Sequence, residues 1–144
     1  MDCIEELLMV KGITQEIFTG KKEKPGLARY VTADSEGAIN INTAPKMVLR
    51  ALADGISAEL ADKMDEYRRK EGSVLSNTDW FFEKMGVTGV TGEQKQKLNN
   101  LITFNSNYFK IISVGSMKNM EQSLSGVVKR SGQKSVQIIK WRQD

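Results

Sequence analysis

The sequence of 144 residues contains no histidine and a single cysteine, Cys3. Without histidine the chain cannot form Ser-His or Cys-His nucleophile pairs, most zinc sites are excluded, and one cysteine cannot form an internal disulfide. We expect Cys3 to be a small, half-buried apolar residue, because a reactive thiol needs a basic neighbourhood. No apolar run approaches the roughly 18 residues of a membrane span, and no signal peptide is recognisable. The protein is then either cytosolic or a soluble piece of a longer protein whose targeting segment lies upstream.

Basic residues are not enriched where a nucleic-acid reader would need them. Lys and Arg number 5 against 7 Asp and Glu in residues 1–38, 9 against 9 in residues 39–104, and 7 against 2 in residues 105–144. The net charge of +3 therefore comes from the C-terminal segment. This distribution argues against the middle of the chain as a nucleic-acid interface.

The most informative stretch joins a strand to a helix within seven residues. Ile39 and Ile41 alternate with Asn40 and Asn42, which predicts a short strand with one apolar face. We expect Asn42 or Thr43 to cap the following helix, and Pro45 to stand in its first turn. The motif to which we assign structural importance consists of Ile39, Asn40, Ile41, Asn42, Thr43 and Ala44.

Two helical pairs are predicted in the middle segment. The first consists of Lys46–Ala53 and Ala58–Lys70, joined by a hairpin at Gly55-Ile56-Ser57, with Ser57 capping the second helix. The second pair, Thr78–Lys84 and Gly92–Thr103, surrounds a hairpin at residues 85–90, with Ser76 or Asn77 as a cap and Leu98, Leu101 and Ile102 as the buried side. Both pairs have the plan of a helix–hairpin–helix.

The spacing of apolar residues differs between the two ends of the chain. Residues 2–19 predict a helix broken at Gly12, and Leu27–Thr32 resembles a strand. From Asn105 the period becomes two, which predicts a three-stranded antiparallel meander with turns at Gly115–Asn119 and Ser131–Gln133. Its strands are expected at Tyr108–Val114, Glu121–Arg130 and Lys134–Trp141. Because three strands alone are marginally stable, we expect a helix across the apolar face, and a missing N-terminal helix is the natural candidate.

These elements predict an α+β fold with three segments. Residues 1–38 form a helix and a short strand, residues 39–104 a helical domain of the helix–hairpin–helix or SAM-like kind, and residues 105–144 a small antiparallel sheet. The two tryptophans, Trp80 and Trp141, lie in apolar patterns and are expected to pack in a core or an interface.

A helix–hairpin–helix binds phosphate when a Gly-x-Gly hairpin points its amides at the anion. Here serine replaces the second glycine at position 57, and Asp54 places a negative charge beside the hairpin. The basic cluster at Arg68–Lys70 ends a helix and follows acidic residues at three- and four-residue spacing, so we expect a solvated, self-neutralised face. Simple helical packing is therefore favoured over DNA binding.

Neither catalysis nor metal binding has a convincing residue set. Asp62, Asp65 and Glu66 lie close together but have lysine and arginine neighbours, which favours helix surface over an acid–base pair. Asp34-Ser35-Glu36 lacks the longer ligand spacing of a recognised calcium loop. The sequence therefore indicates a protein that is not an enzyme, with no catalytic, cofactor-binding or metal-binding residues.

The order of the segments resembles the K-type minor pseudopilins of bacterial type II secretion, over nearly the whole chain but only the C-terminal half of a typical member. The resemblance rests on Glu6–Thr14, the Ile39–Ala44 run, the helical pair ending in Tyr67-Arg68, and the strand opening Asn105–Phe109. It implies a pilin-like fold whose helical domain is inserted before the terminal sheet, and whose absent N-terminal hydrophobic helix anchors the protein in the inner membrane. Some members bind calcium in the helical domain, but no matching ligand run is present here.

The resemblance further implies a structural subunit at the tip of the pseudopilus. Its partners would be the I- and J-type minor pseudopilins, its domain periplasmic in a Gram-negative bacterium, and its role the export of folded periplasmic proteins. The alternative is a helix–hairpin–helix DNA-binding protein of the uptake or repair kind. Salt-dependent duplex binding through residues 46–70 would distinguish the second hypothesis from the first.

Overall fold

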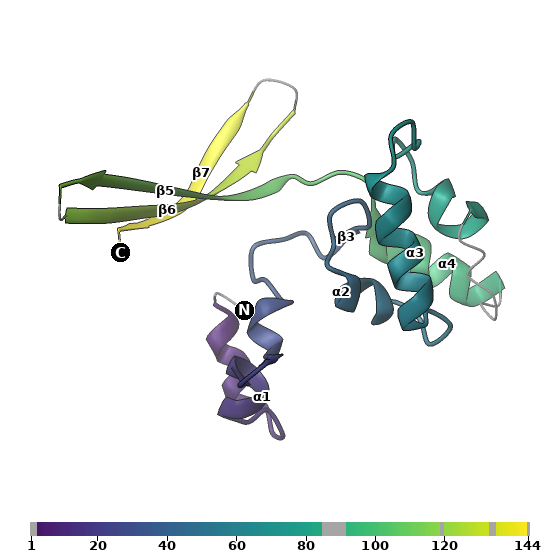
Figure 1. Ribbon diagram of the computed structural model, residues 1–144, viewed down its shortest axis with the longest axis horizontal. Helices are drawn as coiled ribbons and strands as arrows, with labels where there is room; N and C mark the ends of the chain where they lie inside the picture. The colour runs from purple at the N-terminus through teal and green to yellow at the C-terminus, as the bar shows by residue number, and fades with distance from the viewer. Residues whose placement is uncertain (1–2, 85–91, 119, 133–134, 144) are drawn as a thin grey trace. The chain divides into compact units, whose positions relative to one another are not determined.

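The computed structural model describes residues 3–84, 92–118, 120–132 and 135–143 and divides into two compact units, Met1–Asn105 and Ser106–Asp144 (Figure 1). Helices and two-residue strands make up the first unit, and a sheet makes up the second. The predicted α+β class is confirmed at this level of mixed helix and small sheets. Over the described ranges, none of the helices combines the length and the apolar character that a membrane crossing requires.

The N-terminal part consists of short elements around a glycine pair. A 3-10 helix η1 (Ile4–Met9) is followed by Gly12, which has a φ of 98°, and by α1 (Gln15–Thr19), capped by the Thr14 hydroxyl, which accepts a hydrogen bond from Ile17 N at 3.2 Å. The break at Gly12 is thus confirmed. The strands β1 (Gly20–Lys21) and β2 (Lys24–Pro25) bring the backbone of Gly26 against that of Gly20, where a side chain on either residue would collide with main-chain atoms.

Two predictions for this part are wrong. Leu27–Thr32 is not a strand, because the close approach at Gly26 leads the chain into a 3-10 turn, η2 (Leu27–Arg29), closed by a hydrogen bond from Tyr30 N to Leu27 O at 2.8 Å. Cys3 is exposed instead of half-buried, since it precedes η1 as its N-cap and lies outside the helix.

Residues 39–84 and 92–104 share one apolar core. The strand β3 (Ile39–Asn40) pairs in parallel with β4 (Ile102–Thr103), and Ile41 N donates to Thr103 O at 2.9 Å. The helices α2 (Lys46–Arg50) and α3 (Ala58–Arg69) pack against each other, with Ser57 capping α3 as predicted. The largest fully buried side chains of this core are Ile41, Leu49, Met64 and Phe81.

Several boundaries in this core differ from prediction. The helix α2 ends at Arg50 instead of Ala53, because the amides of Ala51 and Leu52 turn back in shorter-range hydrogen bonds. The third helix is a π-helical stretch, η3 (Trp80–Lys84), preceded by the predicted cap Asn77, whose Oδ1 accepts from Asp79 N at 3.2 Å. The predicted hairpin at residues 85–90 lies outside the described residues.

The last helix, α4 (Gly92–Leu101), is shorter than predicted because its final two residues become β4. Leu98 and Ile102 are buried as expected, whereas Leu101 is 49% exposed. Leu101 stands at the point where the helical period gives way to strand alternation, so its side chain leaves the buried row. The helix therefore buries Leu98 and passes directly into the strand that pairs with β3.

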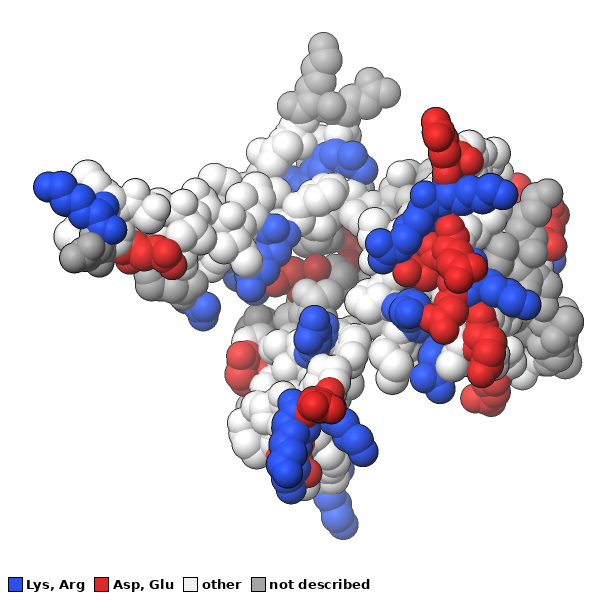
Figure 2. Space-filling view, viewed as in Figure 1, with Lys and Arg blue, Asp and Glu red and all other residues white. Residues whose placement is uncertain are grey.

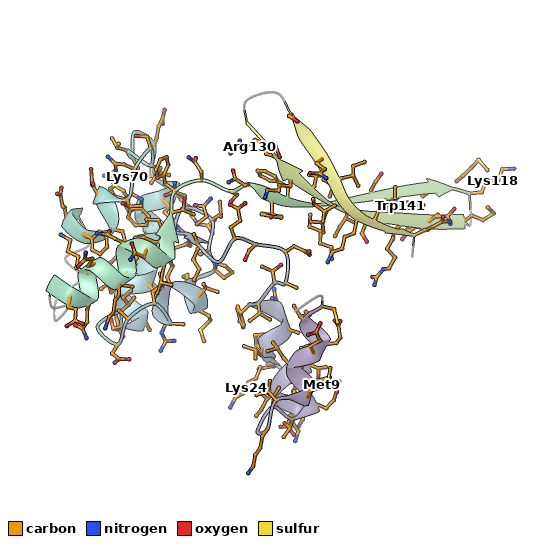
Figure 3. All side chains as sticks on the ribbon, turned by 180° about the vertical axis from the view of Figure 1, so that it is seen from behind. Met9, Lys24, Lys70, Lys118, Arg130 and Trp141 are labelled. Atoms are coloured by element: carbon orange, nitrogen blue, oxygen red, sulfur yellow. The ribbon has the colours of Figure 1, made fainter. Side chains whose placement is uncertain are left out.

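The second unit is an antiparallel meander of β5 (Tyr108–Met117), β6 (Met120–Arg130) and β7 (Val136–Gln143), in the order β5-β6-β7. The predicted topology is confirmed. The turn expected at Gly115–Asn119 is wrong in its first half, because Gly115 pairs with Gln122 and the strands continue to Met117 and Met120. Lys118, with a φ of 55°, stands in the turn (Figure 3). The other predicted turn, Ser131–Gln133, extends beyond the described residues.

Candidate functional site

The Ile39–Ala44 segment lies inside the first unit and is held along its whole length. Ile41 is fully buried and Ala44 nearly so. Asn40 organises the turn into α2, because its carbonyl oxygen accepts from Ala44 N at 2.8 Å and its side-chain oxygen accepts from Asn42 N at 3.0 Å. The segment is therefore a tight turn fixed between β3 and α2, with no free length.

Asn42 connects this turn to two distant parts of the chain. Its side-chain amide donates to Leu75 O at 2.8 Å and to Phe104 O at 3.1 Å, and its oxygen accepts from Trp80 Nε1 at 3.1 Å. The prediction that Asn42 or Thr43 caps α2 is wrong, because the N-cap position belongs to Pro45, which has no side chain able to accept a hydrogen bond. The amide of Asn42 is used instead for contacts across 33 to 62 residues of sequence.

Arg68 holds the same turn from α3. Its Nη1 donates to Ile41 O at 2.9 Å and to Ala44 O at 2.8 Å, and its Nη2 donates to the Asp65 carboxylate. The prediction of a solvated, self-neutralised face at Arg68–Lys70 is wrong for Arg68, whose side chain is only 8% exposed because it reaches the turn instead of water. The prediction holds for Arg69, which is 77% exposed and pairs with Asp65 at 2.9 Å.

Asp65 accepts hydrogen bonds from two arginines, Arg68 and Arg69. Hydrogen bonds from Arg68 and then Arg69 lower the pKa of the Asp65 carboxyl below its ordinary value of 3.8. The carboxylate is thus ionised at neutral pH and orients Arg68 toward the turn. The contacts of Arg68 and Asn42 together leave the Ile39–Ala44 segment with little freedom to move.

The Gly55-Ile56-Ser57 hairpin is not arranged to bind phosphate. The Ser57 hydroxyl accepts from Leu60 N at 3.2 Å and so occupies an amide that a phosphate would use, while Ile56 is buried in the core. Acidic and basic side chains alternate over α3 (Figure 2), and Lys46 pairs with Asp62 at 2.6 Å. This pairing raises the pKa of Lys46, first through the hydrogen bond to Asp62.

The described acidic residues do not fit a calcium site. No group of three or more Asp, Glu, Cys or His side chains within the described ranges could hold a metal ion. Asp65 and Asp62, two of the three acids of the α3 cluster, are bound by arginine and lysine. No metal chemistry is therefore derived from them.

The sheet of the second unit has two unlike faces. Cross-strand partners share a face, and the register places eight large apolar side chains together. We call this the apolar face: Phe109, Ile111, Met117, Met120, Leu124, Val136, Ile138 and Trp141, each at least 43% exposed. Trp141, labelled on β7 in Figure 3, is 66% exposed and is not a core residue of the structure. The expectation that it packs in an interface remains a prediction.

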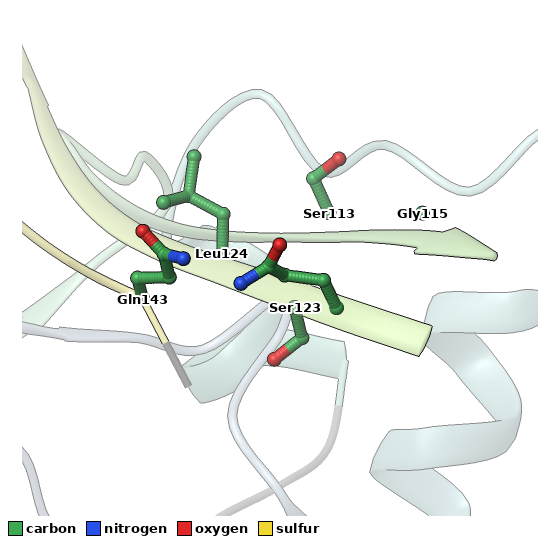
Figure 4. A pocket seen from close by; sticks show the side chains of 6 residues that line it. Ser113, Gly115, Ser123, Leu124 and Gln143 are labelled. Atoms are coloured by element: carbon green, nitrogen blue, oxygen red, sulfur yellow. The ribbon is translucent and has the colours of Figure 1, made fainter. Parts of the chain in front are cut away.

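A shallow depression of about 330 Å³ lies at the end of β7, where β5 and β6 continue toward their turn (Figure 4). It is lined by Ser113, Gly115, Gln122, Ser123, Leu124 and Gln143. None of these side chains titrates near neutral pH, so the depression lacks a general acid, a general base or a charged anchor for a small substrate.

Sequence reasoning missed the roles of Arg68, Asn42 and Trp80 as partners of one turn. The signal for Asn42 was present, because an asparagine among buried isoleucines needs hydrogen-bond partners. The signal for Arg68 was hidden in a cluster of three basic residues, of which only one points inward.

Comparison with known proteins points to type II secretion. Residues 39–105 match the family model described as Type II secretion system (T2SS), protein K. Among solved structures, the chain is similar to a chain of the GspK-GspI-GspJ complex from the enterotoxigenic Escherichia coli Type 2 Secretion System, with a TM-score of 0.58 and 20% sequence identity. The similarity covers 75% of this chain and 37% of that chain, so this sequence spans little more than a third of its length. No curated protein matches the sequence.

The family match contains the complete Ile39–Ala44 segment, including Asn42, and the residues that hold it, Trp80 and Arg68. The structural similarity, at 20% identity, concerns the fold. Over part of the chain, the two findings together support a GspK-type minor pseudopilin.

Proposed function

We propose that this protein is a structural minor pseudopilin of the type II secretion pseudopilus. Residues 39–104 would form a rigid head of helix–hairpin–helix or SAM-like plan, and residues 105–144 the sheet of a pilin-like fold. The observation that carries the proposal is that the protein K match, residues 39–105, coincides with the residues that enclose one core around the Ile39–Ala44 turn. Because internal contacts hold this head in one conformation, it presents a constant shape to its partners, as a structural subunit requires.

The partners we propose are the I- and J-type minor pseudopilins. The similar solved structure is that of a complex named for three such proteins, GspK, GspI and GspJ. The apolar face of the sheet supports an assembled state, because exposed apolar surfaces of this extent mark sites that bind another element.

The location and role follow from the same proposal. The domain would lie in the periplasm, attached to the inner membrane through an N-terminal helix, and would support export of folded proteins from the tip of the pseudopilus. No catalytic role is proposed, and two of the acids on α3, Asp62 and Asp65, are bound in ion pairs. Calcium is not part of the proposal.

The test is reconstitution with purified soluble domains of I- and J-type minor pseudopilins. We expect a stable complex of all three in size-exclusion chromatography and native mass spectrometry. Two variants at adjacent positions probe the apolar face: Ile138→Glu should weaken the assembly at least about tenfold, whereas Gln137→Glu, on the opposite face, should leave it unchanged. Absence of any complex with the unmodified chain would contradict the proposal.

The competing function, DNA binding through the first hairpin, makes the opposite prediction. A duplex titration at low salt should give no binding that depends on the basic residues of 46–70, because Ser57 occupies the helix amide and acidic residues surround the hairpin. Tight, salt-sensitive binding that is lost on removing those lysines and arginines would favour the DNA-binding protein instead.

A further inference from the structure

The strand β5 is an outer strand of the sheet with one long open edge. It pairs with β6 in ten consecutive residue pairs without a register shift, and no other strand of the described residues pairs with it. An outer strand presents a row of backbone N–H and C=O groups that another strand can bind. The question is which groups are available and what they would bind.

The alternation of hydrogen bonds between β5 and β6 shows which backbone groups of β5 point away from β6 and can bind another strand. Arg130 N donates to Asn107 O at 2.7 Å, and in an antiparallel ladder such directly bonded pairs recur at every second residue. Phe109 and Ile111 therefore direct their backbone groups toward β6. Lys110, Ile112 and Val114, between and beyond them, direct theirs outward at the edge of the sheet.

The two edges of the sheet differ in protection. Charged residues, proline and bulges are the usual means by which proteins prevent unwanted pairing at an edge. The β7 edge has Lys140, Arg142 and a register shift between Val127 and Val128. The β5 strand contains no proline, no register shift and one charged residue, Lys110. The β5 edge therefore has fewer features that prevent strand pairing than the β7 edge.

We propose that the β5 edge binds an extended segment of a partner protein, which adds to the sheet as a fourth strand. The segment would place apolar side chains beside Phe109 and Ile111 on one face of the sheet. On the other face it would place a carboxylate opposite Lys110, the single charge of β5, with β-branched residues beside Ile112 and Val114. Charge complementarity at Lys110 sets the position of the added strand, and the backbone hydrogen bonds bind it.

This inference goes beyond the proposed function, because it concerns the edge of the sheet and holds for any segment with this pattern. It is therefore tested with a synthetic probe, independently of the pseudopilin partners. The probe is a peptide of about eight residues that alternates valine and threonine, with one glutamate among its threonines. The control peptide has lysine in place of glutamate.

Amide hydrogen exchange of the complete isotope-labelled chain gives the readout. With saturating peptide, we expect exchange at the Lys110, Ile112 and Val114 amides to slow at least about tenfold, because these outward N–H groups gain acceptors. The amides of Phe109 and Ile111, already bonded to β6, should be unaffected. The lysine peptide should bind more weakly, since it brings like charge to Lys110.

Proline at matched positions of the two edges tests the direction of pairing. Val114→Pro removes an outward donor of β5 and leaves the β6 ladder intact, so peptide binding should fall at least about tenfold. Val136→Pro is the control: Ser131 N donates to Ser135 O at 2.8 Å, which makes the Val136 amide an outward group of β7. The Val136→Pro variant should bind the peptide as tightly as the unmodified chain. Val114→Lys, a milder change at the same edge, replaces the proline variant if that variant unfolds.

Three results would overturn the proposal. The first is peptide binding that leaves the three outward amides unprotected, or no binding at all. The second is protection of these amides without peptide that increases with protein concentration, which would assign the edge to a second copy of the chain. The third is protection without peptide that is independent of concentration, which would assign it to another segment of the same chain.

Discussion

Replacing Arg68 by alanine should destabilise the first unit far more than replacing its neighbour Arg69. Arg68→Ala removes the donors of two buried carbonyls, those of Ile41 and Ala44. An unsatisfied buried acceptor costs about 1–3 kcal/mol, so two would cost roughly 2–6 kcal/mol. Asp65 keeps its hydrogen bond to Arg69, which limits the further loss. We expect a decrease of about 3 kcal/mol in the free energy of unfolding, or roughly 12–24 °C in Tm.

The assay is urea unfolding followed by tryptophan fluorescence in a Trp141→Phe background, so that only the buried Trp80 reports. Arg69→Ala is the matched control, because it removes the other arginine on the same carboxylate from an exposed position. Its effect should stay below about 0.5 kcal/mol. Equal effects of the two substitutions, or a loss below about 1 kcal/mol for Arg68→Ala, would refute the role assigned to Arg68.

Three further predictions concern the same unit. Asn42→Ala should lower the free energy of unfolding by about 2–4 kcal/mol and shift Trp80 emission to the red, because three hydrogen bonds are lost; an unshifted spectrum would contradict the indole contact. Ser57→Ala should cost about 1 kcal/mol in thermal unfolding, as expected for an N-cap, and Ser57→Asp should restore most of it. Asp65 has a lowered pKa, so its stabilisation is present at neutral pH and is lost as the pH falls through that pKa. Asp65→Asn should therefore be less stable than the unmodified protein at pH 7, with the difference vanishing in acid-unfolding curves below that pKa.

The order and type of the larger elements could be predicted from sequence because they depend on local periodicity. The α3 helix has a serine cap and a regular apolar row, and the three strands are rich in β-branched and aromatic residues from Tyr108 onward. Leu27–Thr32 also has a composition that suits a strand, yet it forms no strand, because the Gly20–Gly26 contact turns the chain there. Such a composition shows that a segment could be a strand, but a strand also needs a partner within reach.

The partners of the Ile39–Ala44 turn could not be predicted, because they lie up to 62 residues away in the sequence. The local pattern at Asn42 favoured a helix cap, and that was the only role a nearby residue could suggest. The parallel pairing of β3 with β4 is equally non-local, since it depends on α4 ending where Ile102 can reach Ile39. The sequence indicates that Asn42 needs hydrogen-bond partners, but not that these partners are Leu75, Trp80 and Phe104.

The same reasoning explains why the surfaces of the sheet carry the functional proposals. Alternation in β5, β6 and β7 fixes which side chains share a face once the register is known, but a core and an interface need the same apolar residues. The alternation of backbone hydrogen bonds along β5 gives information that the side chains do not. It shows that the amides of Ile112 and Val114 point outward, whereas those of Phe109 and Ile111 bond to β6. The head is closed by internal hydrogen bonds around Asn42 and Arg68, whereas the sheet has an apolar face and an open edge. Binding to partners is therefore expected to depend on the sheet, and the shape of the subunit on the head.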